Sequence, residues 1–160
     1  MSASASRGRV MAIDLGDRRI GIAISDPTGT IASPAGFIER REGKRPPLTA
    51  LLAKAIELGA TGFVVGLPLD GEGAETERAA EARRLAHELS TRTGLDARLV
   101  DERFTTAAAL NAIKEMDGST RGRKGDVDSM AATLLLQHAM RLAENSDDRR
   151  RTADDGASTQ

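Results

Sequence analysis

Three short hydrophobic runs at the start of the chain, each followed by turn residues, restrict the fold more than any other feature of the sequence. The first two runs, residues 9–14 and 20–25, are rich in Ile, Val and Ala, and Gly16 supplies a turn between them. This pattern predicts a β-hairpin. A third run, residues 30–38, contains Pro34, which cannot donate a hydrogen bond to a neighbouring strand. We therefore expect an antiparallel meander whose third strand lies at the edge of a sheet.

The spacing of the hydrophobic residues then changes from that of strands to that of helices. Leu, Ile and Ala recur every three or four residues over 48–58, and Gly59 ends the pattern. The uninterrupted apolar run at 61–66 indicates a strand buried on both faces. We predict a further helix over 75–93, a strand over 95–100 and a last helix over 127–144. Between these last two, a helix is predicted to begin at Thr105 or Thr106, with Leu110, Ile113 and Met116 as its apolar residues. The order βββαβαβαα predicts an α/β fold, with a mixed five-stranded sheet of three antiparallel and then two parallel strands flanked by helices.

The length of 160 residues suits a single domain. Residues 1–8 and 145–160 contain few apolar side chains, so we expect two disordered tails around one domain at 9–144. No run of about 18 apolar residues occurs, which argues against a segment that spans a membrane.

The composition limits the chemistry of any site. There is no cysteine, which excludes disulfides, thiolate metal sites and cysteine nucleophiles, and suits a cytoplasmic location. The 23 basic and 24 acidic residues nearly cancel, which argues against a strong, general polyanion binder. Because three Phe residues are the only aromatic residues, binding of nucleic acid cannot depend on a base-stacking platform.

Three acidic residues lie where carboxylates are unusual or can converge. Asp14 ends the first strand, which should be the buried middle strand, and a buried carboxylate is costly unless it is paired or bound to a cation. Glu102 follows the fifth strand, at the end of the sheet where ligands collect. Asp128 lies in the first turn of the last helix, where the small residues Ala131 and Ala132 permit close approach to the sheet.

Each acid also has a structural alternative: Asp14 could cap the turn at Gly16, Glu102 could solvate a strand end, and Asp128 could complement the helix dipole. Asp126 lies where we expect the N-cap of the last helix. Three converging carboxylates would need compensation, and Mg²⁺ or Mn²⁺ prefer such oxygen ligands. Two such ions roughly 3.5–4 Å apart activate water in phosphodiester cleavage. The spacing therefore raises the hypothesis of a metal-dependent nuclease.

Four segments of the chain support this hypothesis together. They are AIDLGDRRIGIAISD at 12–26, VVGLP at 64–68, DERFTT at 101–106 and VDSMAATLLLQ at 127–137. In this order and spacing they resemble the YqgF (RuvX-like) family, which is described as Holliday-junction resolvases and pre-16S rRNA nucleases. Only Phe104 and Met130 depart from the family pattern, by apolar exchanges.

The resemblance implies an RNase H-like fold and a nuclease that uses Mg²⁺ or Mn²⁺, with two ions, in the cytoplasm. The implied substrate is the 5′ end of pre-16S rRNA, in ribosome biogenesis. By position, Asp14, Glu102 and Asp128 match the acidic residues of the family motifs, which makes them the predicted catalytic residues and metal ligands.

Further residues are candidates for contact with a nucleic-acid substrate. Gly16 lets the backbone turn beside Asp14. The other candidates, which could bind phosphates, are Arg18, Arg103, Thr105, Thr106 and the basic loop residues Arg121, Arg123 and Lys124. The loop that contains the last three directly precedes the final helix and could be a phosphate-gripping flap or, alternatively, a solvated mobile loop.

Other functions fit parts of the same pattern. A Holliday-junction resolvase would use the same carboxylates, but it usually needs a symmetric dimer, and the sequence leaves the oligomeric state open. The AIDLG segment also resembles the phosphate-binding element of actin, Hsp70 and sugar-kinase ATPases, which need a second domain for which this chain has no room. A third alternative is a non-catalytic RNA-binding module of ribosome assembly. We rank cleavage of precursor rRNA first, with the ribosomal precursor particle as a candidate partner.

Overall fold

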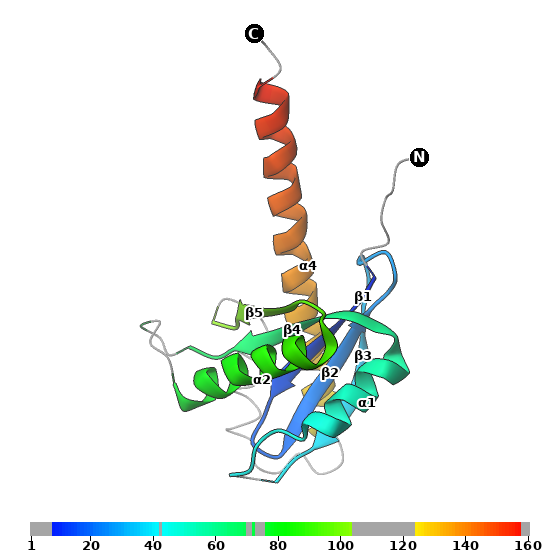
Figure 1. Cartoon of the computed structure of the whole chain (residues 1–160), viewed down its shortest axis with the longest axis vertical. Coiled ribbons are helices and arrows are strands. Elements are labelled where there is room, and N and C mark those ends of the chain that lie inside the picture. The colour runs from blue at the N-terminus through cyan, green and yellow to red at the C-terminus, as the bar shows by residue number, and fades with distance from the viewer. Residues whose placement is uncertain (1–7, 42, 70–71, 73–75, 104–123, 158–160) are drawn as a thin grey trace.

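The chain folds around one mixed β-sheet with helices on both faces (Figure 1). The computed structural model describes residues 8–41, 43–69, 72, 76–103 and 124–157. The strands are β1 (Arg9–Leu15), β2 (Arg19–Ser25), β3 (Ala32–Glu39), β4 (Ala60–Leu67) and β5 (Ala97–Asp101), and their order in the sheet is β3-β2-β1-β4-β5. β1 pairs antiparallel with β2 and parallel with β4, as the predicted topology requires. The predicted five-stranded mixed sheet is confirmed.

The meander also has the predicted arrangement. β3, which contains Pro34, is an edge strand, and β1 lies in the middle of the sheet. The third strand starts at Ala32 rather than at residue 30 because the turn before it is longer than predicted. In that turn the Asp26 carboxylate accepts hydrogen bonds from the backbone N–H groups of Thr30 (2.8 Å) and Ile31 (2.9 Å). These bonds hold the pKa of Asp26 well below its ordinary value.

One face of the sheet is covered by α1 (Leu48–Leu58) and α2 (Glu77–Thr93) (Figure 1). Both helices end at a glycine in the left-handed conformation: α1 at Gly59, as predicted, and α2 at Gly94. Large side chains of β1, β2 and β4, such as Ile13, Ile22 and Phe63, fill the space beneath the helices and are fully or almost fully buried. This layer contains most of the apolar core.

The opposite face is lined by small residues and packs against α4 (Lys124–Ala157). Ala12, Ala23 and Val64 lie on this face, because they alternate with the large side chains of the first face. A methyl group added at Gly21 would lie 2.0 Å from the backbone carbonyl oxygen of Asp128. The Ser129 hydroxyl donates to the carbonyl of Ile22 (2.9 Å) and accepts from the N–H of Gly36, so it fixes α4 to two strands. The helix therefore lies almost directly on the sheet backbone.

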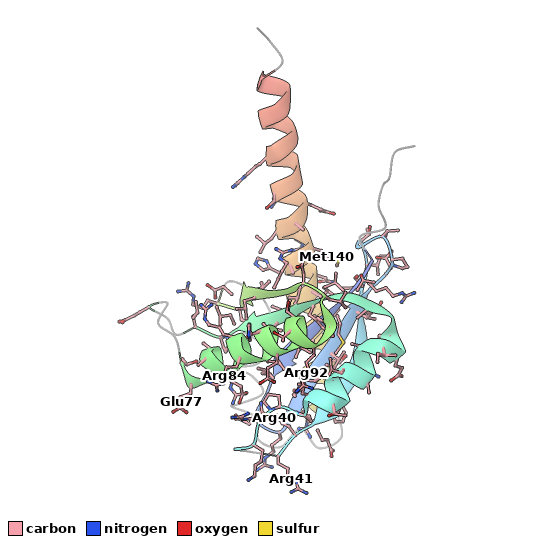
Figure 2. All side chains as sticks on the ribbon, viewed as in Figure 1. Arg40, Arg41, Glu77, Arg84, Arg92 and Met140 are labelled. Carbon is pink, nitrogen blue, oxygen red and sulfur yellow. The ribbon has the colours of Figure 1, made fainter. Side chains whose placement is uncertain are left out.

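α4 is longer than the sequence predicted, in both directions. It begins at Lys124, so Asp126 lies within its first turn and is not its N-cap. It continues to Ala157, whereas we predicted an end at Glu144 and a disordered tail beyond it. The helix leaves the body of the domain near Met140 (Figures 1 and 2), and from Arg141 on most of the described side chains are exposed. A helix that is already docked extends without a new nucleation cost, and no proline follows Pro68 to interrupt it.

The predicted helix that begins at Thr105 or Thr106 lies outside the described residues, as does the tail before Gly8. None of the helices in the described ranges combines the length and the apolar character that crossing a membrane requires.

Candidate active site

Two glycines on the neighbouring strands flank Asp14 at the carboxyl end of β1. Asp14 is 4% exposed and lies on the face that α4 covers, in register with Gly21 of β2. On the other side lies β4, where Val65 pairs with Ile13 of β1 and Gly66 is the next residue, beside Asp14. Because neither glycine has a side chain, both flanks of Asp14 stay open to groups from elsewhere in the chain. These groups come from the segment after β5 and from α4.

Glu102 occupies the flank above Gly66. Its backbone N–H donates to the carbonyl of Leu67 (3.2 Å), and its side chain folds back over β4, where a methyl group on Gly66 would lie 2.0 Å from Oε1. The carboxyl group of Glu102 is buried and makes a hydrogen bond with Asp14. Burial, together with the nearby charge of Asp14, raises the pKa of Glu102 to about 9. Without a cation, this carboxyl group therefore keeps its proton at neutral pH.

Asp128 occupies the flank above Gly21. It is fully buried, and its Oδ2 accepts a hydrogen bond from Nε of Arg19 at 2.9 Å. The Arg19 guanidinium also lies 5.8 Å from the centre of the Phe37 ring. The charge of Asp128 is thus compensated by an arginine of β2, the strand against which α4 packs.

The three predicted carboxylates are therefore brought to one region, but not into one cluster. Asp14 and Glu102 touch, while Asp128 is engaged by Arg19. Within the part of the chain that the structure describes, no three acidic or histidine side chains lie close enough together to hold one metal ion. The donor set of Asp14 and Glu102 suits a hard divalent cation, because a cation can replace the proton that holds two buried carboxyl groups together. Asp128 as a third ligand stays a prediction.

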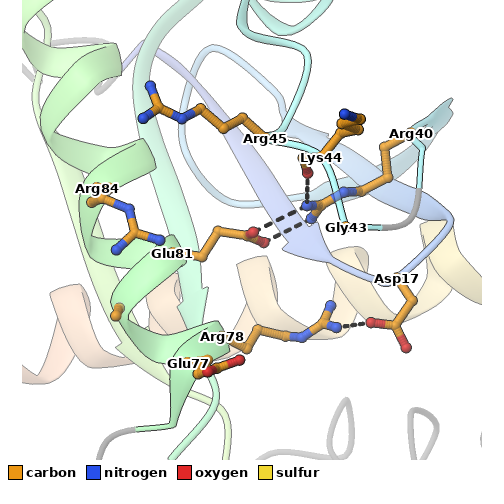
Figure 3. A pocket seen from close by; sticks show the side chains of 10 residues that line it. Asp17, Arg40, Gly43, Lys44, Arg45, Glu77, Arg78, Glu81 and Arg84 are labelled. Carbon is orange, nitrogen blue, oxygen red and sulfur yellow. Dashed lines mark hydrogen bonds and ion pairs between the residues drawn. The ribbon is translucent and has the colours of Figure 1, made fainter.

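Arg78 is a site residue that the sequence analysis missed. It comes from the first turn of α2, and its Nη1 donates to the carbonyl of Leu15, directly after Asp14, at 3.0 Å. Its Nη2 pairs with Asp17 (Figure 3), and its charge lowers the pKa of Glu102 against the two larger effects described above. An arginine in the first turn of a helix opposes the helix dipole, which was the available signal that another interaction holds it there.

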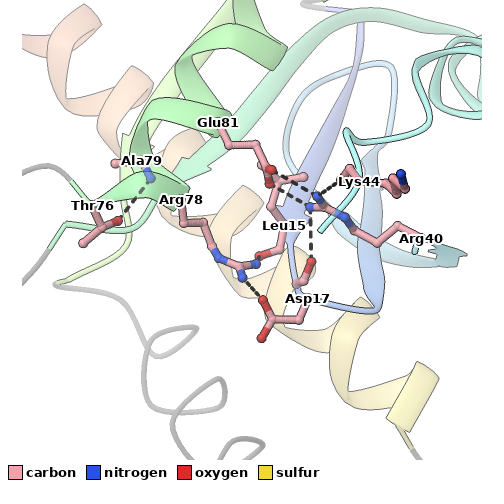
Figure 4. A network of polar contacts seen from close by, with 9 residues as sticks. Leu15, Asp17, Arg40, Lys44, Thr76, Arg78, Ala79 and Glu81 are labelled. Atoms are coloured by element: carbon pink, nitrogen blue, oxygen red, sulfur yellow. Dashed lines mark hydrogen bonds and ion pairs between the residues drawn. The ribbon is translucent and has the colours of Figure 1, made fainter. Parts of the chain in front are cut away.

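The position of Arg78 follows from the start of α2. The hydroxyl of Thr76 caps this helix by accepting from the N–H of Ala79 at 3.1 Å (Figure 4). The same hydroxyl donates to the carbonyl of Pro68 (3.0 Å), just beyond β4. The helix therefore starts at the carboxyl ends of β1 and β4, where Asp14 lies, and its first turn reaches the end of β1.

The predicted substrate contacts have varied positions. The N–H of Gly16 closes the β1–β2 turn by donating to the carbonyl of Arg19 (3.0 Å), and a methyl group on Gly16 would lie 2.4 Å from that oxygen. Arg18 lines a shallow hollow at the same turn. Arg103 pairs with Asp101 at 2.8 Å and keeps the pKa of that carboxyl group low. Thr105, Thr106, Arg121 and Arg123 lie outside the described residues, and Lys124 begins α4. None of these contacts is tested, and they stay predictions.

Residues 8–142 of the chain match the protein-family model RuvX, which is described as a Holliday junction resolvase. The chain belongs to the RuvX family. A relative from Clavibacter michiganensis subsp. michiganensis, named "Putative pre-16S rRNA nuclease", is 38% identical over 133 residues, which are 83% of this chain and 83% of the relative. A relative of the same name from a Nocardioides species is 40% identical over 131 residues, 80% of this chain and 84% of the relative. The family resemblance inferred from the four motifs is confirmed.

The fold of this RuvX chain is also found in a solved structure. T. thermophilus RuvC in complex with a Holliday junction substrate has a TM-score of 0.51 to this chain, and the match covers 85% of this chain and 95% of RuvC. The two sequences are 13% identical, so the likeness is one of fold alone. The predicted RNase H-like architecture is confirmed.

Proposed function

We propose that this protein is a metal-dependent nuclease that hydrolyses phosphodiester bonds at the 5′ end of precursor 16S rRNA. The observation that best supports this is the buried Asp14–Glu102 pair at the carboxyl end of the central strand. The supporting context is the RuvX family itself and relatives named for pre-16S rRNA nuclease activity. The expected location in the cytoplasm is part of the same proposal.

In this proposal Asp14 and Glu102 hold Mg²⁺ or Mn²⁺, and Asp128 adds a third carboxylate from α4. Two divalent ions activate a water molecule and stabilise the leaving oxygen when they are bound. The protein supplies the negative charge that attracts the ions, in a place where burial strengthens electrostatic interactions. Arg19 compensates the charge of Asp128 through their ion pair, and Arg78 limits the excess negative charge beside Glu102.

The test compares the wild-type protein with Asp14→Asn and Glu102→Gln, each of which removes one carboxyl group, and so one candidate metal ligand, from the pair. We expect kcat on precursor 16S rRNA to fall by about a hundredfold or more in each variant, since metal-ion catalysis contributes several kcal/mol to the barrier. Asp128→Asn should act in the same direction. Asp96→Asn is the matched control, because Asp96 is exposed and directly precedes β5. It therefore lies at the amino ends of the parallel strands, whereas Asp14 lies at their carboxyl ends.

Titration with Mg²⁺ and Mn²⁺, and chelation with EDTA, complete this test. Cleavage should require the added metal and should stop on chelation. Undiminished cleavage by Asp14→Asn, or cleavage that persists in excess EDTA, would exclude the mechanism. If the wild-type protein binds precursor rRNA but cuts no substrate with either metal, the non-catalytic assembly module becomes the better description.

A Holliday-junction resolvase is the second candidate, because the matching family model has that description. Assays on a four-way DNA junction and on plain duplex DNA, under the same conditions, separate the two substrates. Paired symmetric cuts in the junction, with rRNA left intact, would favour the resolvase. The same assays run across protein concentrations would show whether cutting depends on a dimer.

A further inference from the structure

A basic hollow lies next to the candidate active site, and apart from Arg78 its residues have no role in the proposed cleavage step. It has a volume of about 550 Å³ and lies between the β1–β2 turn, the loop before α1 and the first turns of α2 (Figure 3). Its described lining contains five basic and three acidic side chains, in a chain whose net charge is −1. We call it the basic hollow; its basic residues are Arg40, Lys44, Arg45, Arg78 and Arg84.

Arg40 is the buried centre of the basic hollow. Its side chain is 5% exposed, and its two Nη atoms bind both carboxylate oxygens of Glu81, at 2.7 and 3.0 Å. The same guanidinium donates to the carbonyls of Lys44 (2.6 Å) and Gly16 (3.3 Å) (Figure 4). Its Nε is buried and has no hydrogen-bond partner among the described residues. Arg40 therefore joins the loop before α1 to the β1–β2 turn and leaves one donor unused.

The acidic residues of the hollow do not neutralise the rest of its lining. Glu81 is bound by Arg40 and Asp17 by Arg78, and the third acidic residue, Glu77, leaves the five basic side chains in excess. For Lys44, Arg45 and Arg84, the described part of the chain contains no ion pair. The charge of Arg84 helps to lower the pKa of Glu81, but among the described residues no acidic group forms an ion pair with any of the three cations. Three such cations on one concave surface are an arrangement that binds phosphate groups through charge-assisted hydrogen bonds.

The hollow is connected to the candidate active site on two sides. Arg78 lines it and also holds the carbonyl of Leu15, the residue after Asp14. Arg40 lines both this hollow and a smaller one of about 340 Å³, which also has Arg19 in its lining. Since Arg19 binds Asp128, the basic residues that line the two hollows extend from α2 to the acidic region, with acidic residues such as Asp17 and Glu39 among them.

We propose that the basic hollow binds a backbone phosphate of the nucleic-acid strand, away from the phosphodiester bond that is cut beside Asp14 and Glu102. This inference rests on the proposed nuclease function and adds a second phosphate site to it. Lys44, Arg45 and Arg84 contact the phosphate, and the Arg40–Glu81 pair joins α2, which carries Arg84, to the loop that presents Lys44 and Arg45. The contact is with the backbone, so it does not depend on base identity.

The test measures binding of a fluorescently labelled RNA that spans the 5′ end of 16S rRNA. All proteins have the Asp14→Asn change, so that no cleavage occurs during the measurement. We expect Arg84→Ala, and the double change Lys44→Ala with Arg45→Ala, each to raise Kd severalfold. The slope of log Kd against log salt concentration should fall by about 0.7 for each lost contact on a single strand. The affinity for inorganic phosphate, measured as a competitor, distinguishes a polynucleotide site from a site for a free anion.

Arg92→Ala is the matched control, because it removes the same charge from the last turn of the same helix, away from the hollow (Figure 2). It should leave Kd and the salt slope unchanged.

If Arg84→Ala and the double variant behave like Arg92→Ala while the wild-type protein cleaves RNA, the hollow is not a phosphate site and the nuclease function stands. If the wild-type protein cleaves nothing but the hollow variants lose affinity and salt dependence, the phosphate site stands and the nuclease function is wrong. If added inorganic phosphate displaces no RNA, the hollow is a site for a polynucleotide. If phosphate at low concentration displaces the RNA, the hollow is a site for a free anion, which contradicts the proposal.

Discussion

At the scale of single residues, two glycines decide how closely the acidic side chains lie to Asp14. Gly21 makes room for the backbone of Asp128, and Gly66 makes room for the carboxyl group of Glu102. The two positions differ in what a methyl group would meet. At Gly21 it would meet backbone, which cannot move without lifting α4, whereas at Gly66 it would meet the end of a flexible side chain. Gly66 is therefore the position where the site can be disturbed with little effect on the fold.

Gly66→Ala should displace Glu102 from Asp14 while the protein stays folded. We expect the increase in melting temperature on addition of Mg²⁺ or Mn²⁺ to be largely lost, because a metal bound only to the native state stabilises it by mass action. Gly62→Ala is the control in the same strand, since its methyl group would lie 3.7 Å from the nearest atom, an ordinary contact. An equal metal-induced shift in Gly66→Ala and Gly62→Ala would show that Glu102 is not held by this glycine.

At the scale of elements, α4 is the part that completes the site. Its residues Ala131, Ala132 and Leu135 are fully buried against the small side chains of the sheet, and Asp128 is one turn earlier on the same helix. Ser129 supplies directional contacts to β2 and β3, which hydrophobic packing alone does not provide. The orientation of Asp128 over the sheet therefore depends on Ser129.

Ser129→Ala should lower the free energy of unfolding by about 1–3 kcal/mol, because it removes both hydrogen bonds of a buried hydroxyl group. Urea denaturation measures this as a lower midpoint with an unchanged m value. Ser146→Ala is the control on the same helix, because its hydroxyl is exposed and donates to the carbonyl of Leu142 in the preceding turn. Equal midpoints for the two variants would mean that Ser129 does not fix the helix.

At the scale of the whole molecule, stability without metal depends on two groups of carboxyl side chains with opposite shifts. Arg40 lowers the pKa of Glu81, and Arg103 lowers that of Asp101. Their contribution is present above the ordinary values of 4.5 and 3.8 and is lost as the pH falls. The pKa of Glu102 is raised from 4.5 to about 9, so its contribution is complete below pH 4.5 and is lost progressively as the pH rises to 9.

The metal-free protein should therefore be most stable at about pH 5, and its free energy of unfolding should fall at both lower and higher pH. Thermal unfolding in EDTA across the pH range measures the two limbs. Glu102→Gln should flatten the alkaline limb and leave the acid limb in place, while Glu81→Gln should weaken only the acid limb. A pH profile of Glu102→Gln identical to that of the wild-type protein would contradict the burial of this carboxyl group beside Asp14.

Much of the fold could be predicted because the relevant signals are local. The hydrophobic runs of β1 and β2, Pro34 in β3 and Gly59 at the end of α1 each act within a few positions of the chain. The end of α4 was predicted incorrectly for the same reason, since its polar composition indicates a solvated segment but does not interrupt a helix that is already formed.

The sequence by itself determined the strand order and the family, because hydrophobic spacing and motif spacing are properties of the chain. The tertiary structure decided which charges meet. Asp128 binds Arg19 from 109 positions away, and Arg78 reaches Leu15 across 63 positions. Such contacts depend on how a helix crosses the sheet, and no local pattern records that crossing. The predicted three carboxylates are thus a touching pair and a third acid held by an arginine, since compensation of each buried charge is settled only when distant elements pack.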